Sequence, residues 1–172
     1  MRGLRCPILN AVFTRHMPYY IRTGQRFSAI ITGTLQSVFI TSDNDMYQHM
    51  NNAIYNFLYD SVINSYLFEF CGLKPDSSPQ YGMVVHSHND YFASISFPAT
   101  AELGLRVNKM GNSSVTYEIA LFEKGVEQVK SVGEFIQVWV DRDTGRPSVH
   151  GIRQHVRDGL QRIMVDTHLS KL

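Results

Sequence analysis

One segment, residues 51–70, constrains the fold of this chain more than any other. Its apolar residues recur at intervals of three and four, the spacing of an α-helix with one broad apolar face. These positions are Tyr55, Leu58, Tyr59, Val62, Ile63, Tyr66, Leu67 and Phe70. Asn51 or Asn52 can cap the start of the helix, and Gly72 can end it in the left-handed conformation. A helix with so wide an apolar face needs a large apolar surface to cover it.

The segments on either side of this helix are predicted to be β-strands. Residues 28–40 are rich in β-branched side chains, and after the turn-rich loop 75–79 the hydrophobic period changes to two. Strands are expected at 81–87, 91–97, 103–110, 115–123 and 126–140. Turns are expected at 111–112 and 124–125, and a short helix within 150–168. This order of elements predicts an α+β fold in which an antiparallel sheet curls around one long helix.

The 172 residues fit a single domain, preceded by a basic extension. We expect residues 1–27 to form this extension and residues 28–172 to form the domain. The first 42 residues contain several arginines but no Asp or Glu, as in many mitochondrial presequences. Pro7 and Pro18 would interrupt the amphipathic helix of a presequence. We therefore expect a cytoplasmic protein, with mitochondrial import as the alternative.

Several classes of function are not supported by the composition. A formal net charge of +1 gives no reason to expect nucleic-acid binding, and no apolar run approaches the roughly 20 residues of a membrane span. Cys6 and Cys71 fit no metal or redox spacing and are expected to be reduced thiols. His86 and His88 would share one face of a strand, but no third ligand is evident. We therefore expect no metal and no redox cofactor.

Two further motifs are rejected on their residues. The segment 141–145 resembles the start of a calcium-binding loop, but the twelfth position is Ile152 rather than Glu. The chain contains no G-x-S-x-G segment, which argues against a serine esterase.

The segment that carries the chemistry lies between the first predicted strand and the helix. Residues 43–55 read DNDMYQHMNNAIY, which resembles D-x-D-x-x-G-H-V-N-N-x-x-Y, the signature of the 4-hydroxybenzoyl-CoA thioesterase-like branch of the hotdog superfamily. Phe97-Pro98 and the hairpin 111–118 also resemble this family, so the resemblance covers roughly residues 30–145. It implies a hotdog fold, an acyl-CoA substrate, hydrolysis of the thioester, and assembly into a homodimer or homotetramer.

The resemblance also implies catalytic roles. Asp45 matches the acidic residue that either attacks the thioester carbonyl or activates a water, whereas Asp43 is expected to be structural. Asn52 and His49 are the other candidate catalytic residues. Free amide groups at the helix start, near residues 50–52, are expected to stabilise the oxyanion. Without the motif, Asp45 would be interpreted as an ordinary turn or cap residue.

Substrate binding is assigned to residues around the same motif and to one hairpin. The resemblance implies a pocket completed across a dimer interface, with CoA held by the partner chain. Gln48 replaces the glycine of the signature, so either the loop takes another path or the Gln side chain enters the pocket. The candidates for substrate contact are Gln48, Asn51, Tyr55, Ser113 and Ser114.

Two other functions remain open for the same fold, because fold does not determine function. One is a non-catalytic hotdog protein that binds an acyl group or CoA, or acts as an interaction module. The other is dehydration of a hydroxyacyl thioester, which usually needs a His with an acidic partner. The behaviour of Asp45 distinguishes the first of these from the hydrolase.

Overall fold

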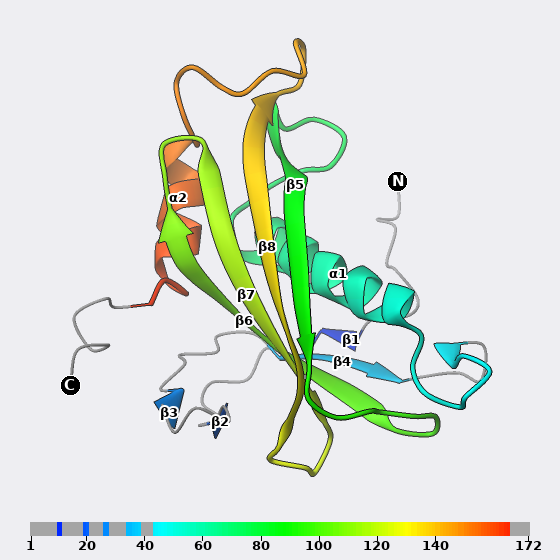
Figure 1. Ribbon diagram of the computed structural model, residues 1–172. Helices are drawn as coiled ribbons and strands as arrows, with labels where there is room; N and C mark the ends of the chain where they lie inside the picture. Colours follow the sequence, from blue (N-terminus) through cyan, green and yellow to red (C-terminus); the bar gives the residue numbers. More distant parts are fainter. Residues whose placement is uncertain (1–9, 12–18, 21–25, 28–33, 39–42, 166–172) are drawn as a thin grey trace.

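The structure is a computed structural model that describes residues 43–165 and the short segments 10–11, 19–20, 26–27 and 34–38. A six-stranded antiparallel sheet has the order β1-β4-β6-β7-β8-β5 (Figure 1). Its strands are β1 (Asn10–Ala11), β4 (Thr34–Val38), β5 (Gln80–Tyr91), β6 (Thr100–Met110), β7 (Ser114–Glu123) and β8 (Val129–Asp141). The helices are α1 (Asn52–Phe70) and α2 (Gln154–Gln161), and β2 (Tyr19–Tyr20) pairs with β3 (Arg26–Phe27).

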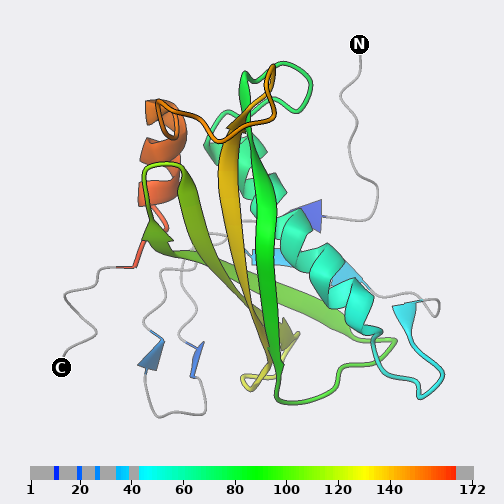
Figure 2. The same ribbon diagram turned by 45° about the horizontal axis from the view of Figure 1, so that its top comes forward.

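The long helix α1 lies across one face of the sheet and buries its apolar side there (Figure 2). Seven of the eight predicted face positions are buried, and Phe70 is partly exposed. On the opposing strands, Tyr117 and Trp139 are fully buried against this face. The Tyr59 hydroxyl donates to Ser131 Oγ at 2.7 Å, so the one polar group of Tyr59 is satisfied within the core. The α+β hotdog prediction, with one helix covered by a curled antiparallel sheet, is confirmed.

Both ends of α1 form as the sequence predicts. The Asn51 side-chain oxygen accepts a hydrogen bond from the Ala53 amide at 3.0 Å. Gly72 has a φ of +68°, which glycine adopts without the steric cost of a Cβ. Because caps satisfy backbone groups that the helix leaves unpaired, these two residues fix where α1 begins and ends.

The prediction of two strands at 81–87 and 91–97 is wrong. A single strand, β5, continues through the polar residues 88–90, and residues 92–99 form a loop. The reason is that β5 is the edge of the sheet and most of its side chains are exposed, so polar residues do not interrupt it. The irregularity in its pairing with β8, between Val84 and His86, disturbs the alternation that the sequence reading relied on.

The C-terminal helix is shorter than the range 150–168. After α2, the chain turns and Met164 forms a parallel bridge with Val107 of β6, so these last residues extend the sheet instead. The turns at 111–112 and 124–125 are confirmed by the hairpins β6–β7 and β7–β8. Residues 166–168 and most of the predicted extension 1–27 lie outside the described residues, so the domain boundary stays a prediction. No helix in the described ranges is long and apolar enough to cross a membrane.

Asp60, on α1, leads to a pH-dependent prediction. Its carboxyl is half-buried, and burial raises its pKa, although a hydrogen bond from Asn64 Nδ2 to Asp60 Oδ2 (2.9 Å) acts in the other direction. A carboxyl whose pKa is higher in the folded protein than in the unfolded chain favours the folded state while it is protonated. This contribution is complete below the pKa of the unfolded chain, about 4, and is lost as pH rises. We therefore expect Asp60→Asn, which keeps an acceptor for Asn64, to raise the thermal unfolding midpoint at pH 7 but not at pH 3.

Circular dichroism melts at the two pH values measure this difference. Asp76→Asn, in the exposed loop after α1, is the matched control and should leave both midpoints unchanged. An equal shift for Asp60→Asn at pH 3 and pH 7 would show that ionisation of Asp60 has no part in the effect.

Candidate active site

The loop before α1 holds the Asp45 carboxylate in place with its own backbone. Asp45 Oδ1 accepts hydrogen bonds from the amides of Tyr47 (2.8 Å) and His49 (3.1 Å). The Asp45 amide donates to the His49 carbonyl at 2.7 Å, and the Gln48 amide to the Asp45 carbonyl at 3.1 Å. Asp45 Oδ2 has no partner among the described residues. One carboxylate oxygen is therefore fixed, and the other is available to a substrate.

Two backbone hydrogen bonds attach this loop to the rest of the domain. The Met50 amide donates to the Ile95 carbonyl at 2.8 Å, and the Asn51 amide donates to the Asp43 carbonyl at 2.9 Å. Met50 and Ile95 are buried, so the loop is anchored in the core immediately beside the exposed Asp45 turn. The Asp43 carbonyl therefore helps to hold the loop at the start of α1, and the structural rather than catalytic role of Asp43 stays a prediction.

The first turn of α1 has one amide group available. Of the amides of residues 50–52, the first two donate to backbone carbonyls, and only that of Asn52 has no acceptor among the described residues. Ala53 donates to the Asn51 side chain, and Ile54 to the Asn51 carbonyl at 2.9 Å. No acidic residue lies in the first turn. The positive end of the helix dipole is therefore not neutralised from within the helix.

Gln48 adopts the backbone conformation for which glycine is suited. Its φ is +64°, and it is the only non-glycine residue with positive φ in the described part of the chain. Its carbonyl accepts a hydrogen bond from Asn44 Nδ2 at 3.3 Å, and its side chain is exposed. The loop thus has a positive φ at this position despite the substitution, and the Gln side chain is exposed beside Asp45.

This conformation leads to a stability prediction for Gln48→Gly. A left-handed conformation costs a residue with a Cβ roughly 1–2 kcal/mol, and glycine avoids this cost. Glycine also increases the conformational entropy of the unfolded chain, which offsets part of the gain in stability. We expect Gln48→Gly to increase the free energy of unfolding by about 1 kcal/mol in urea denaturation. Met46→Gly, two residues earlier in the same exposed loop, should not be stabilising. A loss of stability for Gln48→Gly would contradict the left-handed geometry.

The other predicted site residues are not all in one place. The side chains of His49 and Asn52 are exposed near Asp45, whereas Tyr55 is buried, with its ring 5.0 Å from that of Tyr91. Burial, with Tyr91 alongside, raises the pKa of Tyr55 to about 12, so this phenol stays neutral at physiological pH. A buried Tyr55 can form only the floor of a site.

The hairpin candidates lie at the opposite end of the sheet. Ser114 is aligned with Val138 on β8, which is aligned with Met83 near the start of β5. Tyr91, which contacts the first turns of α1 through Tyr55, is at the other end of β5. Within one chain, Ser113 and Ser114 are therefore not brought together with Asp45.

A polar cluster beside the first turns of α1 is not predicted by the sequence. Asn89 Nδ2 donates to Asn56 Oδ1 at 3.0 Å and is 3.3 Å from the Tyr91 hydroxyl. The Asn89 side-chain oxygen is buried with no hydrogen-bond partner. Asn56 and Asn89 are 33 residues apart, and no local pattern links them. The cluster connects the N-terminal part of α1 to the end of β5.

A hollow of about 400 Å³ lies at the other end of α1. It is lined by Asn64, Phe68, Leu73, Lys74, Pro75, Tyr81, Gly82 and Arg142. In the described part of the chain, no group of three or more His, Cys, Asp or Glu residues could hold a metal ion. His88 instead contacts Asp90, with 3.1 Å between Nε2 and Oδ1.

Comparison with known proteins identifies the family. A family model described as the thioesterase-like superfamily matches residues 40–158, more than half of the chain. The PA5185 protein of Pseudomonas aeruginosa is 40% identical, with a TM-score of 0.74 over 77% of this chain and 92% of that chain. No match was found among curated proteins.

Two more distant structures share the fold. A Thermus thermophilus thioesterase, solved with coenzyme A and zinc, is 20% identical, with a TM-score of 0.63 over 76% of this chain and 92% of that one. A 1,4-dihydroxy-2-naphthoyl-CoA thioesterase from Synechocystis is 11% identical, with a TM-score of 0.66 over 74% of this chain and 94% of that one. The chain belongs to the thioesterase-like superfamily, has the hotdog fold of the 4-hydroxybenzoyl-CoA thioesterase-like family, and is a thioester hydrolase.

Proposed function

We propose that this protein hydrolyses an acyl-CoA thioester to the free acid and CoA, with Asp45 as the catalytic carboxylate. The observation that carries the proposal is the Asp45 turn. One carboxylate oxygen is held by two amides, and the other has no partner among the described residues, directly before a helix with a free first amide. A fixed carboxylate costs little reorganisation when the substrate arrives.

Two chemical routes fit this carboxylate. As a general base, Asp45 would take a proton from a water whose oxygen bonds to the carbonyl carbon. As a nucleophile, it would bond to that carbon itself and form an anhydride that water then cleaves. In both routes the C–S bond breaks and CoA leaves as a thiolate that is then protonated. His49, exposed beside Asp45, is the proposed donor of that proton.

The proposed oxyanion donor is the backbone amide of Asn52. Negative charge that develops on the carbonyl oxygen would be stabilised by this N–H group and by the helix dipole. Removal of such a donor costs roughly 3–4 kcal/mol in other hydrolases. The Gln48 side chain and Asn51 Nδ2 would contact the acyl-CoA from the rim of the site, and Tyr55 would form its floor.

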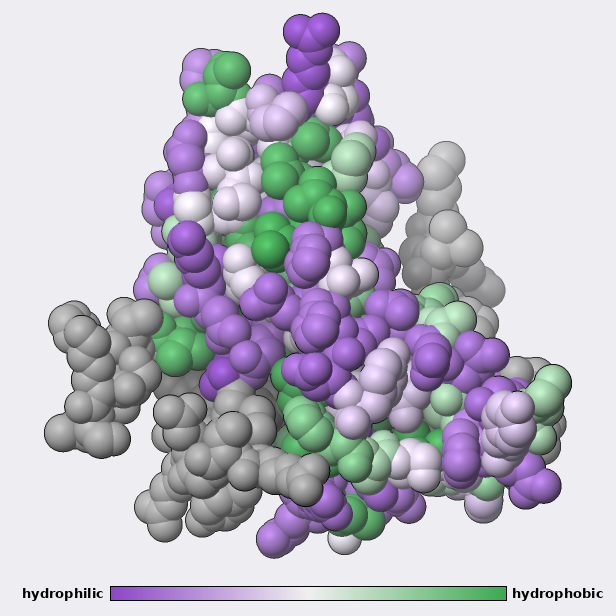
Figure 3. Space-filling model, in the orientation of Figure 1, coloured by the Kyte–Doolittle hydropathy of each residue, from purple (hydrophilic) through white to green (hydrophobic). Residues whose placement is uncertain are grey.

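We further propose that the protein is a homodimer or homotetramer that associates through the edge strand β5. On one side β5 pairs with β8, and on the other it pairs with no described strand. Met83, Val84 and Val85 are exposed on it, and residues 80–91 contain no Lys, Arg or Pro to discourage edge pairing. Figure 3 shows hydrophobic surface over the upper part of the sheet, where β5 and β8 run side by side. In such an assembly, Ser113 and Ser114 would serve the partner's CoA.

Product analysis tests the proposed reaction against its two rivals. Purified protein is incubated with acyl-CoA and, separately, with enoyl-CoA, and the products are identified by mass spectrometry. We expect the free acid and CoA from the acyl-CoA. A hydrated enoyl-CoA without free CoA would favour the dehydratase, and unchanged thioesters that co-purify with the protein would favour a binding module.

A further inference from the structure

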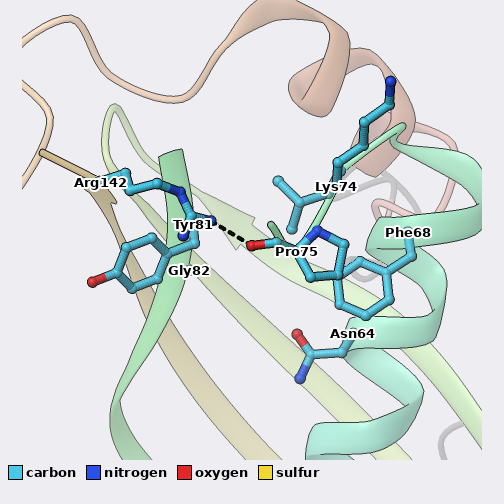
Figure 4. A pocket seen from close by; sticks show the side chains of 8 residues that line it. Asn64, Phe68, Lys74, Pro75, Tyr81, Gly82 and Arg142 are labelled. Atoms are coloured by element: carbon cyan, nitrogen blue, oxygen red, sulfur yellow. Dashed lines mark hydrogen bonds between the residues drawn. The ribbon is translucent and has the colours of Figure 1, made fainter. Parts of the chain in front are cut away.

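The hollow at the C-terminal end of α1 has no part in the proposed reaction. Its volume of about 400 Å³ is within the range of small-molecule sites, roughly 300–1,000 Å³. Figure 4 shows Tyr81 and Arg142 on one side of it, and Phe68 and Pro75 on the other. Almost the whole length of α1 separates Phe68 from Asp45, so within one chain the hollow is a second candidate site.

Hydrogen bonds hold the walls of the hollow in place. Arg142 Nη2 donates to the Pro75 carbonyl at 2.7 Å, and Arg142 Nε donates to the Ser78 carbonyl at 2.6 Å. The Arg142 guanidinium also lies over the Tyr81 ring, 5.4 Å from its centroid. These contacts join the loop after α1 to the end of β8 and the start of β5. The hollow is therefore pre-formed, which lowers the entropy cost of binding a ligand.

The hollow combines aromatic side chains with positive charge. Phe68 and Tyr81 line it from opposite sides, and Phe68 is 40% exposed. Lys74 also lines it, and its ammonium group has no ion-pair partner among the described residues. Aromatic side chains stack on planar bases, and lysine is a common ligand of phosphate. These residues therefore fit a ligand that has a planar ring and a phosphate.

One hydrogen-bond acceptor in the hollow is the side-chain oxygen of Asn64. Asn64 Nδ2 donates to Asp60 Oδ2 at 2.9 Å, and an ionised carboxylate can only accept, so this bond fixes which end of the amide faces Asp60. Figure 4 shows the Asn64 carboxamide extending from α1 toward β5. Asn64 Oδ1 has no donor among the described residues, and it is therefore available to a ligand.

A second acceptor, Gln137 Oε1 on β8, lies directly behind Gly82. Gln137 is 1% exposed, and its Oε1 has no hydrogen-bond partner among the described residues, which is unfavourable for a buried polar atom. Gly82 lines the hollow, and a Cβ at this position would overlap Gln137 Oε1. Because glycine has no Cβ, a rotation of the Gln137 carboxamide directs this oxygen past Gly82 into the hollow.

We propose that this hollow binds a guanine nucleotide. The base lies between Phe68 and Tyr81, and the phosphate contacts Lys74. Guanine has two adjacent donors, N1–H and the 2-amino group, for Asn64 Oδ1 and Gln137 Oε1. Adenine has an acceptor beside its amino group, so one of the two oxygens would face another acceptor. The hollow therefore prefers guanine to adenine, the base of CoA, because a site with unpaired polar groups binds poorly.

Isothermal titration calorimetry of the full-length protein with GMP, AMP and CoA tests the proposal. We expect the dissociation constant of GMP to be at least tenfold lower than that of AMP or CoA. Gln137→Met keeps the length of the side chain and removes the acceptor, so it should weaken GMP binding at least tenfold. Its thermal midpoint should not fall, because the lost oxygen has no partner in the fold. No binding of GMP, or AMP or CoA binding as tight as GMP, overturns the proposal.

A matched pair of variants tests the position of the base. Phe68 and Phe70 on α1 are similarly exposed, at 40% and 37%, but Phe70 does not line the hollow. We expect Phe68→Leu to weaken GMP binding at least tenfold and Phe70→Leu to weaken it less than twofold. Equal losses for the two variants overturn the proposal. Calorimetry does not depend on hydrolysis, so a hydrolase that fails to bind GMP refutes only the nucleotide site.

Discussion

We expect Asp45→Asn to lower kcat for acyl-CoA hydrolysis about 1,000-fold, within the range that loss of a general base or nucleophile produces. The asparagine side-chain oxygen can keep the hydrogen bonds from the Tyr47 and His49 amides, because both of those groups are donors. The loop and the fold should therefore remain, with an unchanged thermal midpoint. What is lost is the negative charge on the second oxygen. Steady-state kinetics with a thiol reagent, together with a circular dichroism melt, measures both quantities.

The matched control is Asp43→Asn, two residues earlier in the same loop. The backbone carbonyl of Asp43 accepts from Asn51, and that bond does not depend on the side chain. We expect kcat to change less than tenfold. If Asp43→Asn and Asp45→Asn reduce hydrolysis equally, the assignment of the chemistry to Asp45 is wrong.

The largest expected effect on stability is that of Gly133→Ala on β8. A Cβ at this position would overlap the ring of Tyr59 and lie 2.8 Å from the side-chain oxygen of Asn89. Tyr59 cannot move away freely, since it is fully buried and its hydroxyl bonds to Ser131. Overpacking of this kind typically costs 1–3 kcal/mol, so we expect the free energy of unfolding to fall by about 2 kcal/mol in urea denaturation.

A double variant distinguishes a steric clash with Tyr59 from a general intolerance of β8 to substitution at Gly133. Tyr59→Leu removes the ring that a Cβ at Gly133 would meet. The combined loss for Gly133→Ala with Tyr59→Leu should be at least about 1 kcal/mol smaller than the sum of the two single losses, because the residues are in direct contact. Strictly additive losses would mean that the close approach of Gly133 and Tyr59 is not what excludes a side chain there.

Much of this fold could be predicted from local patterns. The spacing of apolar residues from Tyr55 to Leu67 predicts α1, and Asn51 and Gly72 mark its ends, since helix periodicity and caps are local properties of the chain. The strands β6, β7 and β8 are likewise confirmed to within a few residues, because one face of each is buried and their apolar residues alternate.

The features that could not be predicted depend on residues far apart in the sequence. The sequence pattern divides β5 into two strands, because the apolar and polar side chains of an exposed edge strand need not alternate. The bond from Asn89 to Asn56 joins two elements through the fold alone. The same holds for the candidate site, where the motif predicts Asp45 and the helix start but not which amide remains available. Asn52 is identified only once the bonds of Met50 and Asn51 are known.

Release of free thiol from a panel of acyl-CoA thioesters tests the central claim most directly. The purified full-length protein is assayed with short-chain, long-chain and aromatic acyl-CoA, each beside the Asp45→Asn variant at equal concentration. The account predicts saturable thiol release from at least one thioester, about 1,000-fold slower in the variant. No release from any of the three classes, or equal release by the two proteins, would contradict it.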